Sequence, residues 1–180
     1  MRSLMVMLPL LMLAACDRQS DPEEQARGAV AGKGMIDISR RGQDAPAMPF
    51  VDPAGNPATL TGFRGKPLLV NLWATWCAPC IAEMPTLDRL AAREKDRLQL
   101  IVVSQDMAGR RAVDPFFAEN KFRMLKPYLD KENVLMLALS SDTLPMTVLY
   151  DAHGTEQWRV IGPMDWEGPK ARQLLDDALD

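Results

Sequence analysis

The strongest constraint on the fold of this chain is an apolar run that leads directly into a pair of cysteines. The run "PLLVNLW" covers Pro67–Trp73, has the length of a strand and contains one isolated polar residue, Asn71. Such a run is typical of a strand buried on both faces, in the centre of a parallel or mixed sheet. Cys77 and Cys80 follow closely. The chain therefore places a buried strand and two thiols in immediate succession.

A helix is predicted to begin after Cys77. Pro79 suits the first turn of a helix, where its missing N–H group costs little. The apolar residues that follow recur at the spacing of one helix face: Ile81, Met84, Leu87, Leu90 and Ala91. The thiol pair is thus expected at the junction between the strand and the N-terminus of a helix.

Further elements surround this junction. Short extended pieces around Asp52–Pro57 predict a hairpin before the central strand, and Leu98–Ser104 predicts a second buried strand after it. Val113–Phe122 is predicted to be a helix with Asp114 as its N-cap. Asn133–Leu139 is predicted to be another short strand.

The C-terminal part reads as a hairpin followed by a helix. Met146–Asp151 and Glu156–Gly162 are extended segments on either side of the turn "DAHG". The closing helix has one apolar face, formed by Ala171, Leu174, Leu175, Ala178 and Leu179. A βαβ unit followed by an antiparallel hairpin and a last helix predicts an α/β fold, a three-layer α/β/α sandwich with an N-terminal β-hairpin extension.

The N-terminus has the pattern of an export signal. Arg2 precedes an uncharged run, Leu4–Ala15, which as a helix reaches about 18 Å and cannot cross a bilayer core of roughly 30 Å. Residues 1–15 are therefore predicted to be a signal peptide. Residues 16–44 are charged and weakly periodic and are predicted to be a flexible tether, although a short strand fits near Met35–Ile38. Residues 45–180 are predicted to form the folded domain.

The end of the signal resembles a bacterial lipoprotein processing box. The letters "LAAC" end at Cys16, and the resemblance implies cleavage before this residue and acylation of its sulfur and its new amino group. Several acyl chains hold a protein stably on a membrane. Asp17 stands where enterobacterial lipoproteins carry an inner-membrane retention signal. The expected location is therefore the periplasmic face of the bacterial inner membrane.

Three functions compete for the thiol pair. A zinc site needs four ligands, whereas the mature chain offers only this pair and His153. A purely structural disulfide between residues three apart closes a very small loop, which gives little entropic stabilisation. A C-x-x-C pair at the start of a helix after a buried strand is the thioredoxin-like context. The sequence favours a redox couple.

The expected roles of the two thiols differ. Cys77 should lie at the helix N-terminus, where unpaired N–H groups and the helix dipole favour a thiolate, so it is the predicted nucleophile in disulfide exchange. Cys80 lies one turn further in and is the predicted resolving thiol. Ala78 and Pro79 set the turn between them and so tune the reduction potential.

Several segments together resemble the TlpA-type (ResA-like) membrane-tethered thioredoxins. These segments are "GKPLLVNLWATWCAPCIAEMPTLDRL", "AMPFVDPAGNPATLTGFRGK", "LPMTVLYDAHG" and "GPMDW", and the likeness covers roughly residues 45–180. The resemblance implies a thioredoxin-like fold and thiol–disulfide oxidoreductase activity outside the cytoplasm. It also implies disulfide-containing protein substrates, such as apocytochrome c or copper-site assembly proteins, and an integral-membrane dithiol carrier as electron donor.

The resemblance assigns roles to single residues. Cys77 and Cys80 match the attacking and resolving thiols, and no cofactor is expected beyond their redox-active disulfide. Pro145 matches the cis-proline that faces the dithiol, and Leu144 before it would offer backbone hydrogen bonds to an extended substrate segment. Trp76 is expected to shield the surface of the site.

Two positions near the thiols depart from cytoplasmic thioredoxins. Asn71 stands where those proteins carry a buried aspartate that moves protons for the resolving thiol, and an amide cannot titrate. Glu83 matches the acid of the membrane-tethered family and could take over this task, or it could be an ordinary solvated helix residue. The position between the cysteines that is acidic in some relatives is Ala78 here.

The alternatives differ in direction and in class. A disulfide oxidase or isomerase has the same fold and differs only in its potential relative to its partners. A copper metallochaperone would use the soft thiolates as ligands, but copper-delivery relatives space their cysteines by three and add a histidine. A thiol peroxidase would need a lone peroxidatic cysteine in another context. The net charge of −3 and the lack of a basic cluster argue against nucleic acid as a partner.

Overall fold

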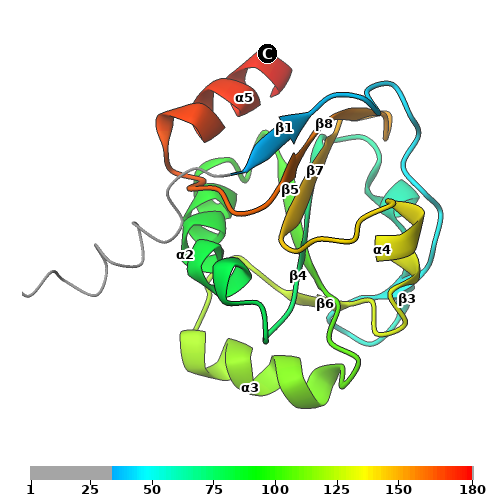
Figure 1. Ribbon diagram of the computed structural model, residues 1–180, viewed down its shortest axis with the longest axis vertical. Helices are drawn as coiled ribbons and strands as arrows, with labels where there is room; N and C mark the ends of the chain where they lie inside the picture. Colours follow the sequence, from blue (N-terminus) through cyan, green and yellow to red (C-terminus); the bar gives the residue numbers. More distant parts are fainter. Residues whose placement is uncertain (1–33, 180) are drawn as a thin grey trace, which may run out of the picture.

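The computed structural model describes residues 34–179, which form one mixed sheet with helices on both faces (Figure 1). The strands are β1 (Met35–Asp37), β2 (Phe50–Val51), β3 (Pro57–Ala58), β4 (Leu68–Trp73), β5 (Gln99–Ser104), β6 (Pro127–Leu129), β7 (Met146–Tyr150) and β8 (Glu156–Ile161). The helices are the 3₁₀ helix η1 (Leu60–Phe63) and the α-helices α2 (Ala78–Arg93), α3 (Arg110–Asn120), α4 (Val134–Ala138) and α5 (Pro169–Leu179). The eight strands follow the order β1-β8-β7-β4-β5-β6-β2-β3 across the sheet.

Strand β4 is the predicted central strand. It pairs in parallel with β5 and antiparallel with β7, and all six of its residues are buried. Its alternate residues face opposite layers, because successive side chains of a strand point to opposite sides. Leu69 and Trp73 belong to one apolar cluster, whereas Val70 and Leu72 belong to the other. The continuous apolar run in the sequence is thus explained by burial on both faces.

The two apolar clusters separate the three layers. The first cluster joins β4 to α2 through Met84 and Leu87, to α3 through Val113 and to α5 through Leu175. The second cluster lies on the opposite face and includes Leu135 of α4. Figure 1 shows α2 and α4 on opposite sides of the sheet. This is the three-layer α/β sandwich that the sequence predicts.

The predicted hairpins and the closing helix are confirmed. β2 and β3 pair antiparallel around the turn after Asp52, and β7 and β8 pair antiparallel around the turn at Gly154, which adopts a positive φ of 85°. Glycine adopts this φ without strain. Helix α5 buries Ala171 and Leu175 of its predicted apolar face.

The predicted strand at Asn133–Leu139 is wrong, because this segment contains helix α4. The carboxylate of Asp130 accepts hydrogen bonds from the backbone N–H groups of Val134, Leu135 and Met136 at 3.0, 3.0 and 3.1 Å. These N–H groups belong to the first helical turn, which has no partners of its own for them. The capping side chain lies in the preceding loop, so the apolar run alone did not reveal the helix.

The predicted start of helix α3 is also wrong. The helix begins at Arg110 rather than at Val113, and its N-cap is Gly109 instead of Asp114. The Arg110 guanidinium donates hydrogen bonds to the backbone oxygens of Asp52 and Pro53 at 3.0 and 2.7 Å. This contact with the loop between β2 and β3 holds the first turn of the helix. A long-range contact of this kind leaves no local signal in the sequence.

The folded part begins earlier than residue 45. Strand β1 pairs antiparallel with β8, and Asp44 forms an isolated bridge with Thr155. The strand that fits the sequence near Met35–Ile38 is therefore present, and residues 35–44 of the predicted tether belong to the fold. The signal peptide, Cys16 and the rest of the tether lie outside the described residues. Within residues 34–179, no helix is both long enough and apolar enough to cross a bilayer.

A buried ion pair ties the sheet to the loop before β7. Glu156 and Arg159 of β8 are both 3% exposed, and the two carboxylate oxygens each lie 2.6 Å from a guanidinium nitrogen. The same guanidinium donates to the backbone oxygen of Leu139 at 2.7 Å and lies 3.9 Å from the sulfur of Met146. Leu139 precedes the loop of residues 140–145 and Met146 follows it. One buried cation thus holds both ends of this loop.

Candidate functional site

The thiol pair forms a disulfide at the N-terminus of helix α2. The two sulfurs are 2.06 Å apart, and the Cα atoms of Cys77 and Cys80 are 5.2 Å apart. Cys77 is the N-cap of the helix, and its sulfur accepts a hydrogen bond from the backbone N–H of Cys80 at 3.3 Å. Cys77 is 6% exposed, whereas Cys80 is fully buried. The predicted helix start is confirmed, and Cys77 is the more exposed of the two cysteines.

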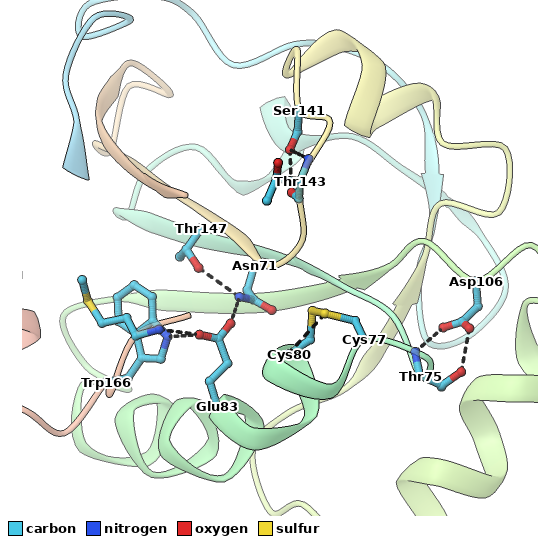
Figure 2. The surroundings of a disulfide bond; sticks show 11 residues. Asn71, Thr75, Cys77, Cys80, Glu83, Asp106, Ser141, Thr143, Thr147 and Trp166 are labelled. Atoms are coloured by element: carbon cyan, nitrogen blue, oxygen red, sulfur yellow. Dashed lines mark hydrogen bonds between the residues drawn. A yellow bond between two sulfur atoms is a disulfide. The ribbon is translucent and has the colours of Figure 1, made fainter. Parts of the chain in front are cut away.

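The loop before the disulfide is held by Asp106. This carboxylate, just after β5, accepts hydrogen bonds from the backbone N–H of Thr75 at 2.9 Å and from its hydroxyl at 2.6 Å (Figure 2). The hydroxyl of Ser104 donates to the same carboxylate at 2.7 Å. Trp76 lies between this anchor and Cys77 with 69% of its surface exposed. Its indole is therefore available at the surface beside the disulfide.

The predicted cis-proline is present. The Leu144–Pro145 peptide bond is cis, at the end of the loop that precedes β7. Pro145 is buried, and its backbone oxygen accepts a hydrogen bond from the N–H of Gly162 at 2.9 Å. Leu144 is half-buried and contacts both apolar clusters.

Glu83 is a buried carboxyl and not a solvated helix residue. It is fully buried and accepts hydrogen bonds from the Nδ2 of Asn71 at 2.7 Å, the backbone N–H of Met164 at 3.0 Å and the indole Nε1 of Trp166 at 3.3 Å (Figure 2). The Nδ2 of Asn71 also donates to the hydroxyl of Thr147 at 2.9 Å. The carboxyl thus joins α2 to β4 and to the loop after β8.

Burial raises the pKa of Glu83 to about 7, because loss of hydration disfavours the charged form. The hydrogen bonds from Met164, Asn71 and Trp166 act in the opposite direction, since each of them stabilises the carboxylate. The result is a carboxyl that changes its protonation state near neutral pH. Cys80 lies three residues earlier, on the same buried face of α2. The site therefore combines a disulfide with a buried carboxyl one helical turn after its inner cysteine.

Sequence reasoning found the two cysteines, Pro145 and Glu83 but missed two supporting residues. Asp106 carries a weak signal, because it is an acid directly after a buried strand at the edge where the disulfide lies. Thr147 carries none, because it alternates with apolar residues as any strand threonine does.

The fold and the disulfide at the start of α2 define a thioredoxin-like thiol–disulfide oxidoreductase. The chain belongs to the Redoxin family, whose profile matches residues 40–175.

Curated relatives have the same activity in their names. The thiol-disulfide oxidoreductase ResA of Geobacillus thermodenitrificans is 29% identical over 131 residues, which cover 72% of this chain and 74% of the relative. The thiol:disulfide interchange protein DsbE of Pseudomonas aeruginosa is 33% identical over 142 residues, which cover 72% of this chain and 73% of the relative.

Solved structures share the fold. StoA from Bacillus subtilis superposes with a TM-score of 0.59 at 24% identity and covers 73% of this chain and 97% of its own. The thioredoxin domain of a thiol-disulfide oxidoreductase from Bacteroides vulgatus superposes with a TM-score of 0.64 at 24% identity, covering 78% of this chain and 98% of its own. The predicted thioredoxin-like fold is confirmed.

The raised pKa of Glu83 predicts a loss of stability as the pH rises. The ordinary pKa of a glutamate is 4.5, so between pH 4.5 and about 7 the folded protein binds more protons than the unfolded chain does. Stability therefore falls as the pH rises through this window, by up to about 3 kcal/mol for a shift of this size. Urea unfolding of the oxidised protein at pH 4.5 to 8 measures the effect.

A matched pair of variants isolates the contribution of Glu83. Glu83→Gln should flatten the dependence, whereas Glu119→Gln, at an exposed position on α3, should leave it unchanged. Equal slopes for the wild type and Glu83→Gln would contradict the assignment.

Proposed function

We propose that the protein is an extracytoplasmic, membrane-tethered protein disulfide reductase. One observation carries the proposal: the Cys77–Cys80 disulfide caps helix α2 beside Glu83, a buried carboxyl with a pKa of about 7. The names of the ResA and DsbE relatives support thiol–disulfide exchange as the chemistry. The redox-active cysteine pair is the only cofactor that this chemistry needs.

The proposed reaction starts from the reduced cysteine pair. The thiolate of Cys77, the more exposed of the two cysteines, attacks one sulfur of a substrate disulfide. The substrate S–S bond breaks, and the leaving sulfur takes up a proton. Cys80 then loses its proton and attacks the sulfur of Cys77, which closes the Cys77–Cys80 disulfide and releases the second substrate thiol. The substrate gains two electrons from the cysteine pair and two protons, of which one comes from Cys80 and the other replaces the proton that Cys77 released to water when its thiolate formed.

Glu83 is the proposed acceptor of the Cys80 proton. Cys80 is fully buried, so bulk water does not reach its sulfur directly. A carboxyl with a pKa near 7 exists in both protonation states at neutral pH, which is the condition for efficient general base and acid catalysis. Asn71 cannot perform this task because an amide does not titrate.

The proposed partners follow from the direction of electron flow. The substrates are proteins with accessible disulfides, such as apocytochrome c or the assembly proteins of copper sites. An integral-membrane dithiol carrier would reduce the Cys77–Cys80 disulfide after each cycle. A lipid on Cys16 would hold the domain on the periplasmic face of the inner membrane, close to this carrier.

The division of labour between the cysteines is tested by trapping. Cys80→Ser should accumulate a mixed disulfide with substrate through Cys77, because no thiol remains to resolve it. Cys77→Ser is the matched control and should form few adducts, since Cys80 is buried. Non-reducing electrophoresis of cell extracts measures both. More adducts with Cys77→Ser than with Cys80→Ser would reverse the assigned roles.

The direction of the reaction is tested by the reduction potential. A reductant should have a potential nearer that of thioredoxin, about −270 mV, than that of the strong oxidant DsbA, about −120 mV. Equilibration of the purified protein with dithiothreitol or glutathione buffers measures the value. A potential at the oxidising end would favour a disulfide oxidase or isomerase of the same fold.

The lipid anchor is tested by metabolic labelling with a fatty-acid analogue. The wild type should be labelled and should sediment with membranes, whereas Cys16→Ser should be unlabelled. Cys80→Ser serves as the control, since it removes a cysteine without touching the processing box. An unlabelled wild-type protein would rule out the anchor while leaving the exchange chemistry intact.

A further inference from the structure

The side-chain amide of Asn71 has hydrogen-bond partners for its nitrogen but none for its oxygen. Its Nδ2 donates hydrogen bonds to Glu83 at 2.7 Å and to Thr147 at 2.9 Å. Its Oδ1 is buried and has no hydrogen-bond partner. Leaving a buried acceptor without a hydrogen bond is destabilising, because the group has lost its contacts with water. The Oδ1 of Asn71 therefore lacks a hydrogen-bond donor in the protein with the Cys77–Cys80 disulfide.

The orientation of the amide is set by its neighbours. Turning it over would place Oδ1 against the Glu83 oxygen that now accepts from Nδ2. With Nδ2 held by Glu83 and Thr147, the Oδ1 of Asn71 points toward the disulfide (Figure 2). Asn71 shares its face of β4 with Leu69 and Trp73, which is the face that α2 covers.

The missing donor can come from Cys80. This residue is fully buried and belongs to the same apolar cluster as Leu69 and Trp73, on the side of α2 that faces β4. In the disulfide its sulfur carries no hydrogen. Reduction adds two electrons and two protons, breaks the S–S bond and turns each sulfur into a thiol. The S–H group of Cys80 is then a donor on the side of the helix that faces Asn71.

We infer that Asn71 is a positioning residue that accepts a hydrogen bond from the Cys80 thiol in the reduced protein. This bond holds the proton on Cys80 while Cys77 attacks a substrate. It also favours the reduced state, because the acceptor is unsatisfied in the disulfide and satisfied in the dithiol. The inference rests on the proposed function only for the assignment of Cys80 as the resolving thiol.

The effect on the redox equilibrium is measured with the full chain carrying Cys16→Ser, so that Cys77 and Cys80 are its only cysteines. Asn71→Leu removes the acceptor in both redox states. Its equilibrium with glutathione should shift about tenfold toward the disulfide, which is about 30 mV for a two-electron couple. Thr147→Val is the matched control: it removes a polar partner of Asn71 but leaves Oδ1 in place, so its shift should stay below about twofold. An unchanged equilibrium for Asn71→Leu would overturn the inference.

The hydrogen bond itself is measured by infrared spectroscopy. In a protein with Cys16→Ser and Cys77→Ala, Cys80 is the only thiol and cannot form an internal disulfide. Its S–H stretching band should lie at the lower wavenumber of a hydrogen-bonded thiol, and adding Asn71→Leu should move it to the value of a free thiol. A free-thiol band with Asn71 intact would overturn the inference, even if the leucine variant does not fold.

The two measurements also separate this inference from the proposed function. A wild type that does not exchange with glutathione would refute the oxidoreductase proposal, yet the S–H band of the Cys77→Ala protein would still decide the role of Asn71. A shifted equilibrium with an unchanged band would mean that Asn71 acts only through Glu83, which also overturns the inference.

Discussion

The rest of the site depends on the hydrogen bonds that the buried carboxyl of Glu83 accepts. It lies on helix α2 and accepts hydrogen bonds from β4 through Asn71 and from the loop after β8 through Met164 and Trp166. Burying a carboxyl is costly, and these donors offset only part of the cost. The part of this cost that the donors do not offset raises the pKa of Glu83. The same buried carboxyl therefore holds three segments of the chain together and has a pKa near neutral pH.

The parts of the fold that the sequence predicts well are those with a local signal. Strand β4 was recognisable because burial on both faces requires an unbroken apolar run. The start of α2 was recognisable because a cysteine pair with Pro79 in the first turn marks a helix N-terminus. The cis bond before Pro145 has no local signal and was inferred from the resemblance of its surroundings to a known family.

The parts that the sequence misses depend on contacts between distant segments. Helix α4 needs the carboxylate of Asp130 as its cap, and an apolar run of five residues fits a strand equally well. The first turn of α3 needs Arg110 to reach the loop at Asp52. The burial of Glu83 depends on Trp166, which follows it by 83 positions. An acid at this helix position would otherwise be read as solvated.

The buried contacts of Arg159 limit which segments can be exchanged between related proteins. Its guanidinium belongs to β8, yet it holds the backbone of Leu139 at the end of α4 and lies against Met146 beyond the cis-proline. The loop that ends at Pro145 is therefore not an independent module. A chimera that grafts this loop from another protein must keep the backbone oxygen of Leu139 at the guanidinium of Arg159, because losing this contact would leave a buried charge short of one hydrogen-bond acceptor. The loop that ends at the cis-proline and the register of the β7–β8 hairpin are in this sense inherited together.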